Sequence, residues 1–346
     1  MYSLISEILN ASLDNKGHAI SIGESRDNKS IAGYRFGYGE YQLSLIAGCH
    51  ADEPTGPKLL NYLVGYLSKL PLNHPLINDY TWWIVPHVNP DGEAINQSWY
   101  DEDEECYDLA RYLRYVRREL PGDDVEFGFP IEGKRAALRP ENQVIYDFWR
   151  STGKSFDLHI SLHGMSMAQG PWFLIDPSWI NRCELIMERC KQKVLDMKYR
   201  LHDVDREGEK GFHRIGKGFC TRPDSEEMRK YFLSKGQPAE ADKFHPSSME
   251  SIRSLGGDCL TLVSEMPLFI LPPNDDISWP NKNWESWKDR FQNWKYKILS
   301  DQIGEEEFEK QVKESGLKAM AIKDQMILQW HFFWSGVEQM QQSKAE

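Results

Sequence analysis

Four short apolar runs, each ending at a polar turn or a reactive side chain, constrain this chain more than any other feature. The runs cover Tyr41–Gly48, Thr81–Val88, Phe156–His163 and Cys259–Glu265. Short apolar runs between turn signals are typical of buried strands. Helical stretches separate them, and strands that alternate with helices predict an α/β sheet with helices on both faces. We expect Gly164 and Pro267 to end the third and fourth strands.

The segments between these runs predict the helices and the division of the chain. Leucines at helical spacing follow Pro57. Further helices are expected near residues 102–120, 140–152 and 177–198. Residues 203–250 are polar and rich in Gly, Lys, Glu and Pro, which indicates an irregular insertion. We predict one domain over residues 1–283 and a Trp-rich helical extension over residues 284–346 that packs on it.

The composition excludes several classes of protein. The formal net charge is −12, so the surface repels phosphate backbones and nucleic acid is not an expected partner. No apolar run approaches the ~20 residues that span a bilayer, so no membrane partner is expected. The N-terminus carries Glu7 and Asp14 and lacks the basic start and long apolar core of a secretory signal. Six scattered cysteines without a C-x-x-C pair indicate reduced thiols, and we expect a cytoplasmic protein.

Three of the four runs end at side chains that suit metal chemistry. His50 and Glu53 follow the first run, His163 ends the third and Glu265 ends the fourth. Ligands bind at the carboxyl ends of strands in open α/β sheets. Two histidines and one carboxylate make a catalytic zinc site with one position left for water. A carboxylate outside the ligand set, here Glu265, can then take the proton of that water.

The third ligand has a competitor in the same run. His159 and His163 point the same way in a regular strand, because side chains alternate with period two. The D-L-H sequence that ends at His159 also resembles the ligand motif of related deacylases. We assign His163, because the following Gly-Met-Ser and the spacing to Glu265 match peptidases better.

Four motifs in this order resemble the zinc carboxypeptidase family of the carboxypeptidase A type. They are AGCHADEPTG, the NPDG turn, ISLHG and TLVSEMP, and the resemblance covers roughly residues 40–270. The resemblance implies a mixed, mainly parallel eight-stranded sheet between helices, and one zinc ion per chain. By this likeness the zinc ligands are His50, Glu53 and His163, and the general base is Glu265.

Two further residues carry over from the family in the segment RRELPGDDVEFGFP. Arg117 falls where the family keeps the arginine that polarises the scissile carbonyl, although Arg118 is an alternative. Asp124 falls where the family places a carboxylate that orients the first zinc histidine.

The sequence departs from the family where the substrate is held. Glu126 and Phe127 replace the Asn-Arg pair that grips the terminal carboxylate, and His245 lies where many members carry a tyrosine. Arg253 lies in the segment that lines the specificity pocket in the family. We therefore expect a poor carboxypeptidase toward ordinary C-terminal residues, because Glu126 would repel a terminal carboxylate or attract an amine. Three outcomes fit these residues. Another cation, such as Arg135, Arg139 or Arg253, holds a differently placed carboxylate, or the pocket selects an amine-bearing end such as diaminopimelate, or most activity is lost.

These residues together predict a zinc-dependent metallopeptidase or amidase that acts on a peptide or an acyl-amino acid. The first alternative is a deacylase of the aspartoacylase and succinylglutamate desuccinylase type, which shares the fold and the ligand pattern. The second is a non-catalytic zinc-binding or scaffold protein on a peptidase fold. Retention of Glu265 argues against the second alternative, because a structural metal site does not need an unligated base.

Overall fold

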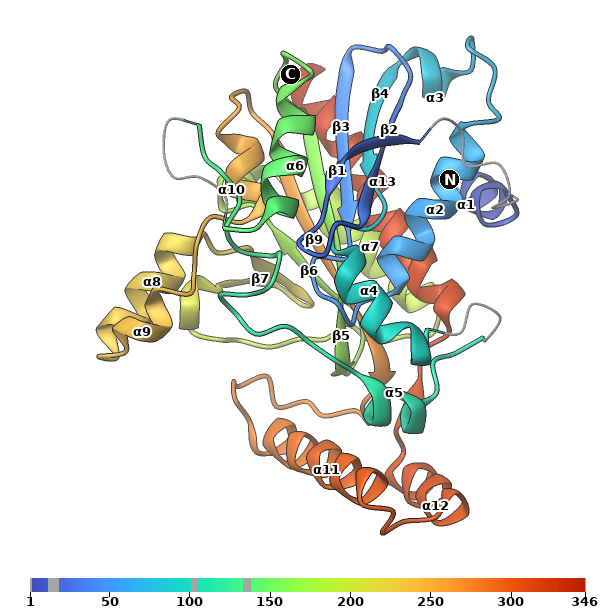
Figure 1. The fold of residues 1–346 in the computed structure, drawn as a ribbon, viewed down its shortest axis with the longest axis vertical. Coiled ribbons are helices and arrows are strands. Elements are labelled where there is room, and N and C mark those ends of the chain that lie inside the picture. Colours follow the sequence, from blue (N-terminus) through green and yellow to red (C-terminus); the bar gives the residue numbers. More distant parts are fainter. Residues whose placement is uncertain (1, 12–18, 101–104, 133–137, 346) are drawn as a thin grey trace.

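A mixed sheet of ten strands forms the centre of the computed structural model, which describes residues 2–11, 19–100, 105–132 and 138–345. The strand order is β1-β2-β4-β3-β5-β9-β6-β8-β7, with β10 paired to β9 (Figure 1). The strands are β1 (Ile20–Glu24), β2 (Ser30–Phe36), β3 (Tyr41–Ala47), β4 (Tyr80–Val85), β5 (Leu158–Ala168), β6 (Trp172–Ile175), β7 (Arg214–Gly216), β8 (Phe219–Thr221), β9 (Leu260–Ile270) and β10 (Lys318–Ala319).

The central strands β4, β3, β5 and β9 are parallel, and antiparallel strands extend the sheet on either side. Their side chains are buried on both faces, as a sheet covered by two layers of helices requires. The predicted mixed α/β sheet between helices is therefore confirmed. It has ten strands instead of eight, and three of the ten lie outside the expected core of the sheet: the 203–250 segment supplies β7 and β8, and the tail supplies β10.

Helices cover both faces of the sheet (Figure 1). One face packs against α2 (Thr55–Leu67), α7 (Glu184–Asp196) and α13 (Ile322–Ala345), with α1 (Tyr2–Leu9) outside α2. The other face packs against α6 (Pro140–Arg150) and α10 (Ser248–Arg253). The shorter helices are α3 (Pro75–Asn78), α4 (Pro90–Asn96), α5 (Leu109–Tyr115), α8 (Ser225–Ser234), α9 (Pro238–Ala241), η1 (Gln97–Trp99), η2 (Pro177–Arg182) and η3 (Glu209–Gly211).

Two predicted strand ends were wrong. β5 continues through Gly164 to Ala168, and β9 continues through Pro267 to Ile270. The two strands remain paired along this length, which holds both in the extended conformation. Pro267 is tolerated because neither β6 nor β10 pairs with β9 at this residue. β6 pairs with β9 only as far as Glu265, and the pairing of β10 with β9 starts at Phe269. Proline thus stands where β9 has no neighbour on its second side.

The C-terminal segment is helical but not a single appendage. α11 (Lys282–Leu299) and α12 (Glu305–Ser315) form a pair below the sheet in Figure 1. α13 instead returns to the main core, where Trp330, Phe332 and Phe333 are fully buried. None of the described helices is both long enough and apolar enough to cross a membrane.

Gly48 ends β3 and begins the turn that leads to His50. Its φ is +74°, and a Cβ atom there would lie 2.6 Å from ring atoms of His87. Gly153 has a similar φ of +64° but nothing within 4 Å of an added Cβ. Both glycines therefore have left-handed backbone, but only Gly48 is also closely packed.

We expect Gly48→Ala to destabilise the protein more than Gly153→Ala. Left-handed backbone costs a non-glycine residue about 1–3 kcal/mol at either position, and Gly48→Ala adds the clash with His87. Urea unfolding of both variants measures the difference in the free energy of unfolding. Equal losses would show that the His87 ring moves aside freely.

Candidate active site

The predicted reactive side chains meet at one edge of the sheet. His50 and Glu53 lie in the turn between β3 and α2. His163 lies in β5, and the β5–β9 register places it directly opposite Glu265. The parallel pairing of β3 with β5, in which Ala47 stands opposite Leu162, brings the turn beside His163. The sheet thus assembles four residues that are far apart in the chain.

His50, Glu53 and His163 form a compact cluster with the Nδ1 atoms of both rings turned inward. His50 Nδ1 lies 2.7 Å from Glu53 Oε1, and His163 Nδ1 lies 3.0 Å from Glu53 Oε2. The two Nδ1 atoms are 3.3 Å apart. All three ligand-type atoms lie within 4.8 Å of one another. Two imidazole nitrogens and one carboxylate at this spacing fit a catalytic zinc ion.

The charges in this cluster support one another. Burial would raise the pKa of Glu53, but the neighbouring His50 and His163 hold it well below its usual value. Burial would lower the pKa of His163, but the carboxylates of Glu126 and Glu53 raise it well above the usual value. The cluster is therefore a site built for positive charge, whether carried by a proton or by a metal ion.

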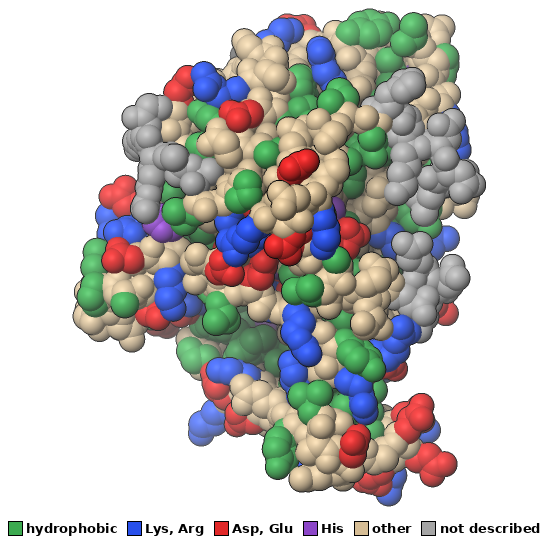
Figure 2. Space-filling model, in the orientation of Figure 1, with side chains coloured by type: hydrophobic (Ala, Val, Ile, Leu, Met, Phe, Trp, Pro, Cys, Tyr) green, Lys and Arg blue, Asp and Glu red, His purple; other side chains and the backbone are tan. Residues whose placement is uncertain are grey.

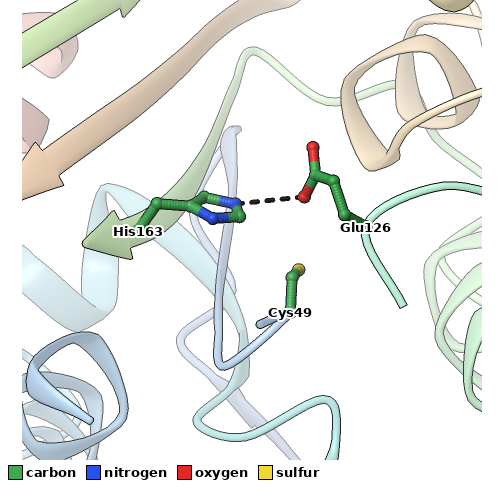
Figure 3. A group of neighbouring side chains, drawn as sticks. All are labelled: Cys49, Glu126 and His163. Carbon is green, nitrogen blue, oxygen red and sulfur yellow. Dashed lines mark ion pairs between the residues drawn. The ribbon is translucent and has the colours of Figure 1, made fainter. Parts of the chain in front are cut away.

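The second nitrogen of His163 faces a different carboxylate. Nε2 lies 3.2 Å from Glu126 Oε2 (Figure 3). It also lies 2.8 Å from the hydroxyl of Ser161. Glu126 is buried and its other oxygen accepts a hydrogen bond from Arg222. Burial raises the pKa of Glu126, but His163 and Arg222 lower it to about 2. A carboxylate on the outer nitrogen is the usual way to orient a metal-binding histidine.

Cys49 completes the group drawn in Figure 3. Its sulfur, Glu126 and His163 bring a second set of ligand-type atoms within 4.8 Å. Burial raises the pKa of the Cys49 thiol, and Arg222 already neutralises Glu126. This buried group therefore serves better as support for His163 than as a second metal site.

Glu265 is placed to act as a base beside the cluster. Burial, together with the negative charge of Glu53, raises its pKa to about 7, against the lowering effect of nearby His163 and other cations. A carboxylate with a pKa near the working pH is well suited to proton transfer. The placement agrees with the role predicted for Glu265.

Of the two candidate arginines, Arg118 reaches the cluster. Its Nη1 lies 3.3 Å from Glu53 Oε1 and donates to Asp52 Oδ1 at 3.2 Å. Both arginines are exposed, but the guanidinium of Arg117 donates to the carbonyl of Val116. The catalytic role predicted for Arg117 therefore has no geometric support, and Arg118 is the arginine to test. Residues 116–120 are outside any helix, so a helical period could not distinguish the two.

Asp124 and His159 are both buried near the cluster but outside it. The Asp124 carboxylate accepts from the backbone N–H of Phe127, and burial raises its pKa to about 6 although His50 opposes the shift. The ring nitrogens of His159 contact the hydroxyls of Ser44 and Ser248, and burial lowers its pKa to about 3. His159 is thus satisfied as a core residue, which leaves His163 as the candidate ligand.

The predicted substrate residues are engaged elsewhere. Phe127 packs against Phe244, and Arg253 donates to Asp176 and Asp224. His245 lines a separate depression beside α8 and α9. Arg139 is held by Glu119 and Glu141, and Arg135 lies outside the described residues. Within the described part of the chain, none of these side chains lines the cavity at Glu265.

Sequence reasoning missed the residues that support the cluster from a distance. Gln329 in α13 donates to the main-chain carbonyl of His163 at 3.2 Å. Gln325, one turn earlier, accepts from Thr55 beside Glu53 at 2.9 Å. Arg222 and Ser161 hold the far side of His163 as described above. Nothing local in the sequence marks Arg222 or Ser161. Gln325 and Gln329 could have been found, because they are polar residues at consecutive turns of an apolar helix.

The chain is similar to known carboxypeptidases. The family model described as zinc carboxypeptidase matches residues 6–173. The fold is similar to that of carboxypeptidase A from Helicoverpa armigera, with a TM-score of 0.51 and 14% identity over all of this chain and 72% of that one. Bovine thrombin-activatable fibrinolysis inhibitor (TM-score 0.43, 14% identity, 87% and 94% covered) is also similar. So is a metallo-carboxypeptidase from Burkholderia cenocepacia (0.40, 13%, 87% and 68%).

The predicted resemblance to zinc carboxypeptidases is thus confirmed. The match to the family model includes the turn with His50 and Glu53, and it includes His163. It ends before Glu265, which the sheet register brings to the same place.

We expect His50→Ala to lose most of the zinc that the wild-type protein retains after dialysis, because one of three ligands is gone. Elemental analysis of the dialysed protein gives the zinc content per chain. His213→Ala is the matched control, since His213 is exposed and outside the cluster. Full zinc retention by His50→Ala would contradict the ligand assignment.

Proposed function

We propose that this protein is a zinc-dependent hydrolase of a peptide or peptide-like amide bond. The observation that carries the proposal is the cluster of His50, Glu53 and His163 with Glu265 directly opposite His163. A metal-ligand set beside a carboxylate that does not belong to it provides both parts of a hydrolytic centre. The zinc carboxypeptidase-like fold supports the same class of reaction.

The three cluster residues would hold the zinc ion. Zinc in such a site supplies a Lewis acid that polarises a carbonyl and brings the pKa of water to ~7. Glu126 and Ser161 keep the outer nitrogen of His163 occupied, so Nδ1 remains turned toward the ion. Gln329 fixes the backbone at the same residue. These contacts hold His163 in the orientation that ligation needs.

Glu265 carries the proton in the proposed reaction. Its carboxylate takes a proton from the attacking water and gives it to the departing amine nitrogen. A group with a raised pKa serves both steps, because it can gain and lose a proton near neutral pH.

Arg118 stabilises the oxyanion that develops on the scissile carbonyl. Its guanidinium lies beside Glu53 and lines the same cavity as Glu265. Fixed donors aimed at a developing negative charge contribute strongly to catalysis, because they need no reorganisation during the reaction. Asp52 holds the guanidinium in place from the other side.

The structure changes the reason to expect poor activity on ordinary C-terminal residues. Glu126 is paired with Arg222 and His163, so its charge is compensated and does not repel a substrate carboxylate. The Asn-Arg pair is nevertheless missing from its usual place. A carboxylate-bearing substrate must therefore be held by another cation.

We expect Glu265→Gln to retain fold and zinc but to lose about 10²–10⁴-fold in kcat, the range for removal of a general base. The substitution keeps size and removes the proton acceptor. Turnover is measured on a panel of peptides, γ-glutamyl peptides and acyl-amino acids, which also separates peptidase from deacylase activity. Wild-type turnover in a zinc-loaded Gln variant would disprove the mechanism.

Arg118→Gln and Arg117→Gln form a matched pair with the same change in charge. We expect Arg118→Gln to lower kcat by about 10²–10³-fold, as removal of an oxyanion donor does. Arg117→Gln should change kcat little, because this guanidinium donates to the main-chain carbonyl of Val116 and not to the cluster. The kinetics of both variants are compared on the same substrate, and the opposite order of effects would restore Arg117 as the catalytic arginine.

A further inference from the structure

A cavity of about 320 Å³ opens beside Glu265 and Arg118. Its walls come from β5 and β6, from the segment 202–212 and from the start of α11. The aromatic residues in the wall are Trp172, Phe212, Trp279 and Trp284. In Figure 2 hydrophobic side chains lie in the hollow between the main body and the α11–α12 pair. The cavity is thus an aromatic pocket next to the proposed base.

Arg206 is built into the wall of this pocket. Its guanidinium lies over the rings of Phe212 and Trp279, at 4.4 and 5.1 Å from their centroids. Glu209 accepts hydrogen bonds from its Nε and Nη2, at 2.9 and 2.7 Å. The side chain is only 13% exposed. Among the described residues none accepts a hydrogen bond from Nη1, so this donor is available to a ligand.

His202 gives the pocket a second polar group. It is buried, it packs edge-on against Trp172, and its Nδ1 has no hydrogen-bond partner among the described residues. A buried polar atom without a partner is costly, and a ligand that supplies the partner recovers the loss. His202 and Arg206 therefore both favour a polar occupant at the aromatic wall.

The hydrogen-bond donors of the pocket favour an occupant with acceptor oxygens. Its described lining contains two arginines, Arg118 and Arg206, and one carboxylate, Glu265. Both arginines are paired with a carboxylate outside the lining, Arg118 with Asp52 and Arg206 with Glu209. They differ from the other arginines considered for substrate binding because they line the cavity, where Nη1 of Arg206 has no acceptor among the described residues.

We propose that Arg206 binds a carboxylate of the substrate in this pocket, with the aromatic rings holding the planar or apolar part that carries it. This inference rests on the proposed hydrolase function and names its substrate class: amides that bear a carboxylate near the scissile bond. The cation comes from the 203–250 segment and not from the position where the sequence lacks the Asn-Arg pair. The carboxylate belongs either to a C-terminus or to an acidic side chain, and both present the same chemistry to a guanidinium.

Binding of two small probes tests the proposal without turnover. 3-Phenylpropionate carries an aromatic ring and a carboxylate, and 4-phenyl-2-butanone replaces the carboxylate with a neutral ketone. Binding is measured by titration calorimetry on protein that has been treated with a chelator, so that the carboxylate cannot bind to zinc. We expect the carboxylate to bind about 10- to 100-fold more tightly than the ketone, the range for a hydrogen bond to a charged group.

Matched variants assign the preference to one residue. Arg206→Gln should abolish the preference for the carboxylate, and Arg206→Lys should keep part of it. Arg214→Gln is the control, since Arg214 lies in the same segment, pairs with Asp203 and is outside the cavity. No preference in the wild-type protein, or an equal preference in Arg206→Gln, would overturn the proposal. Circular dichroism of each variant checks that it is folded.

Kinetics on peptides that the protein hydrolyses distinguish a C-terminal carboxylate from that of an acidic side chain. Arg206→Gln should raise KM with little change in kcat for the substrates that use the subsite. If Arg206 binds a C-terminal carboxylate, amidation of the peptide C-terminus removes the rise in KM. If Arg206 binds an acidic side chain of the peptide, amidation leaves the rise in KM unchanged. A variant with unchanged KM on both would contradict the subsite. Binding of the probes does not require Glu265, so failure of the proposed reaction would leave the binding result intact.

Discussion

The parallel pairing of β5 with β9 is the interaction on which the candidate site depends. It sets His163 opposite Glu265, and the neighbouring β3–β5 pairing brings the turn with His50 and Glu53 to the same edge. A slip of one residue in either ladder would turn a whole row of side chains to the other face. The geometry of the candidate site is thus specified by backbone hydrogen bonds in the middle of the sheet, where burial on both faces makes slippage costly.

Most buried charged groups at this edge of the sheet lie beside a group of opposite charge. Glu53 and Glu126 lie on opposite nitrogens of His163, Arg222 neutralises Glu126, and Arg118 lies between Asp52 and Glu53. A buried charge without a partner costs several kcal/mol, so removal of one member would leave its neighbour with an uncompensated charge. Glu265 is the member without a direct ion-pair partner among the described residues, and its raised pKa is the result.

The residues of the candidate site could be proposed from the sequence because each follows a short apolar run in its own segment. The sheet class, which is confirmed, and the zinc ligand set, which stays a prediction, both follow from that local pattern. The lengths of β5 and β9 do not. Gly164 and Pro267 are local breakers that pairing between distant strands overrides. The choice of Arg118 over Arg117, and the support from Arg222 and Gln329, depend on contacts between segments far apart in the chain. No spacing rule reports such contacts.

The contact of α13 with the candidate site has a consequence for how the protein is made. Gln329 and Gln325 hold the backbone of His163 and the turn beside Glu53, yet they lie in the last of the described elements. A chain still on the ribosome can form most of the sheet before this helix emerges. Its metal-ligand cluster then lacks two of the hydrogen bonds that support it. Support of the candidate site is therefore complete only when α13 has packed on the sheet.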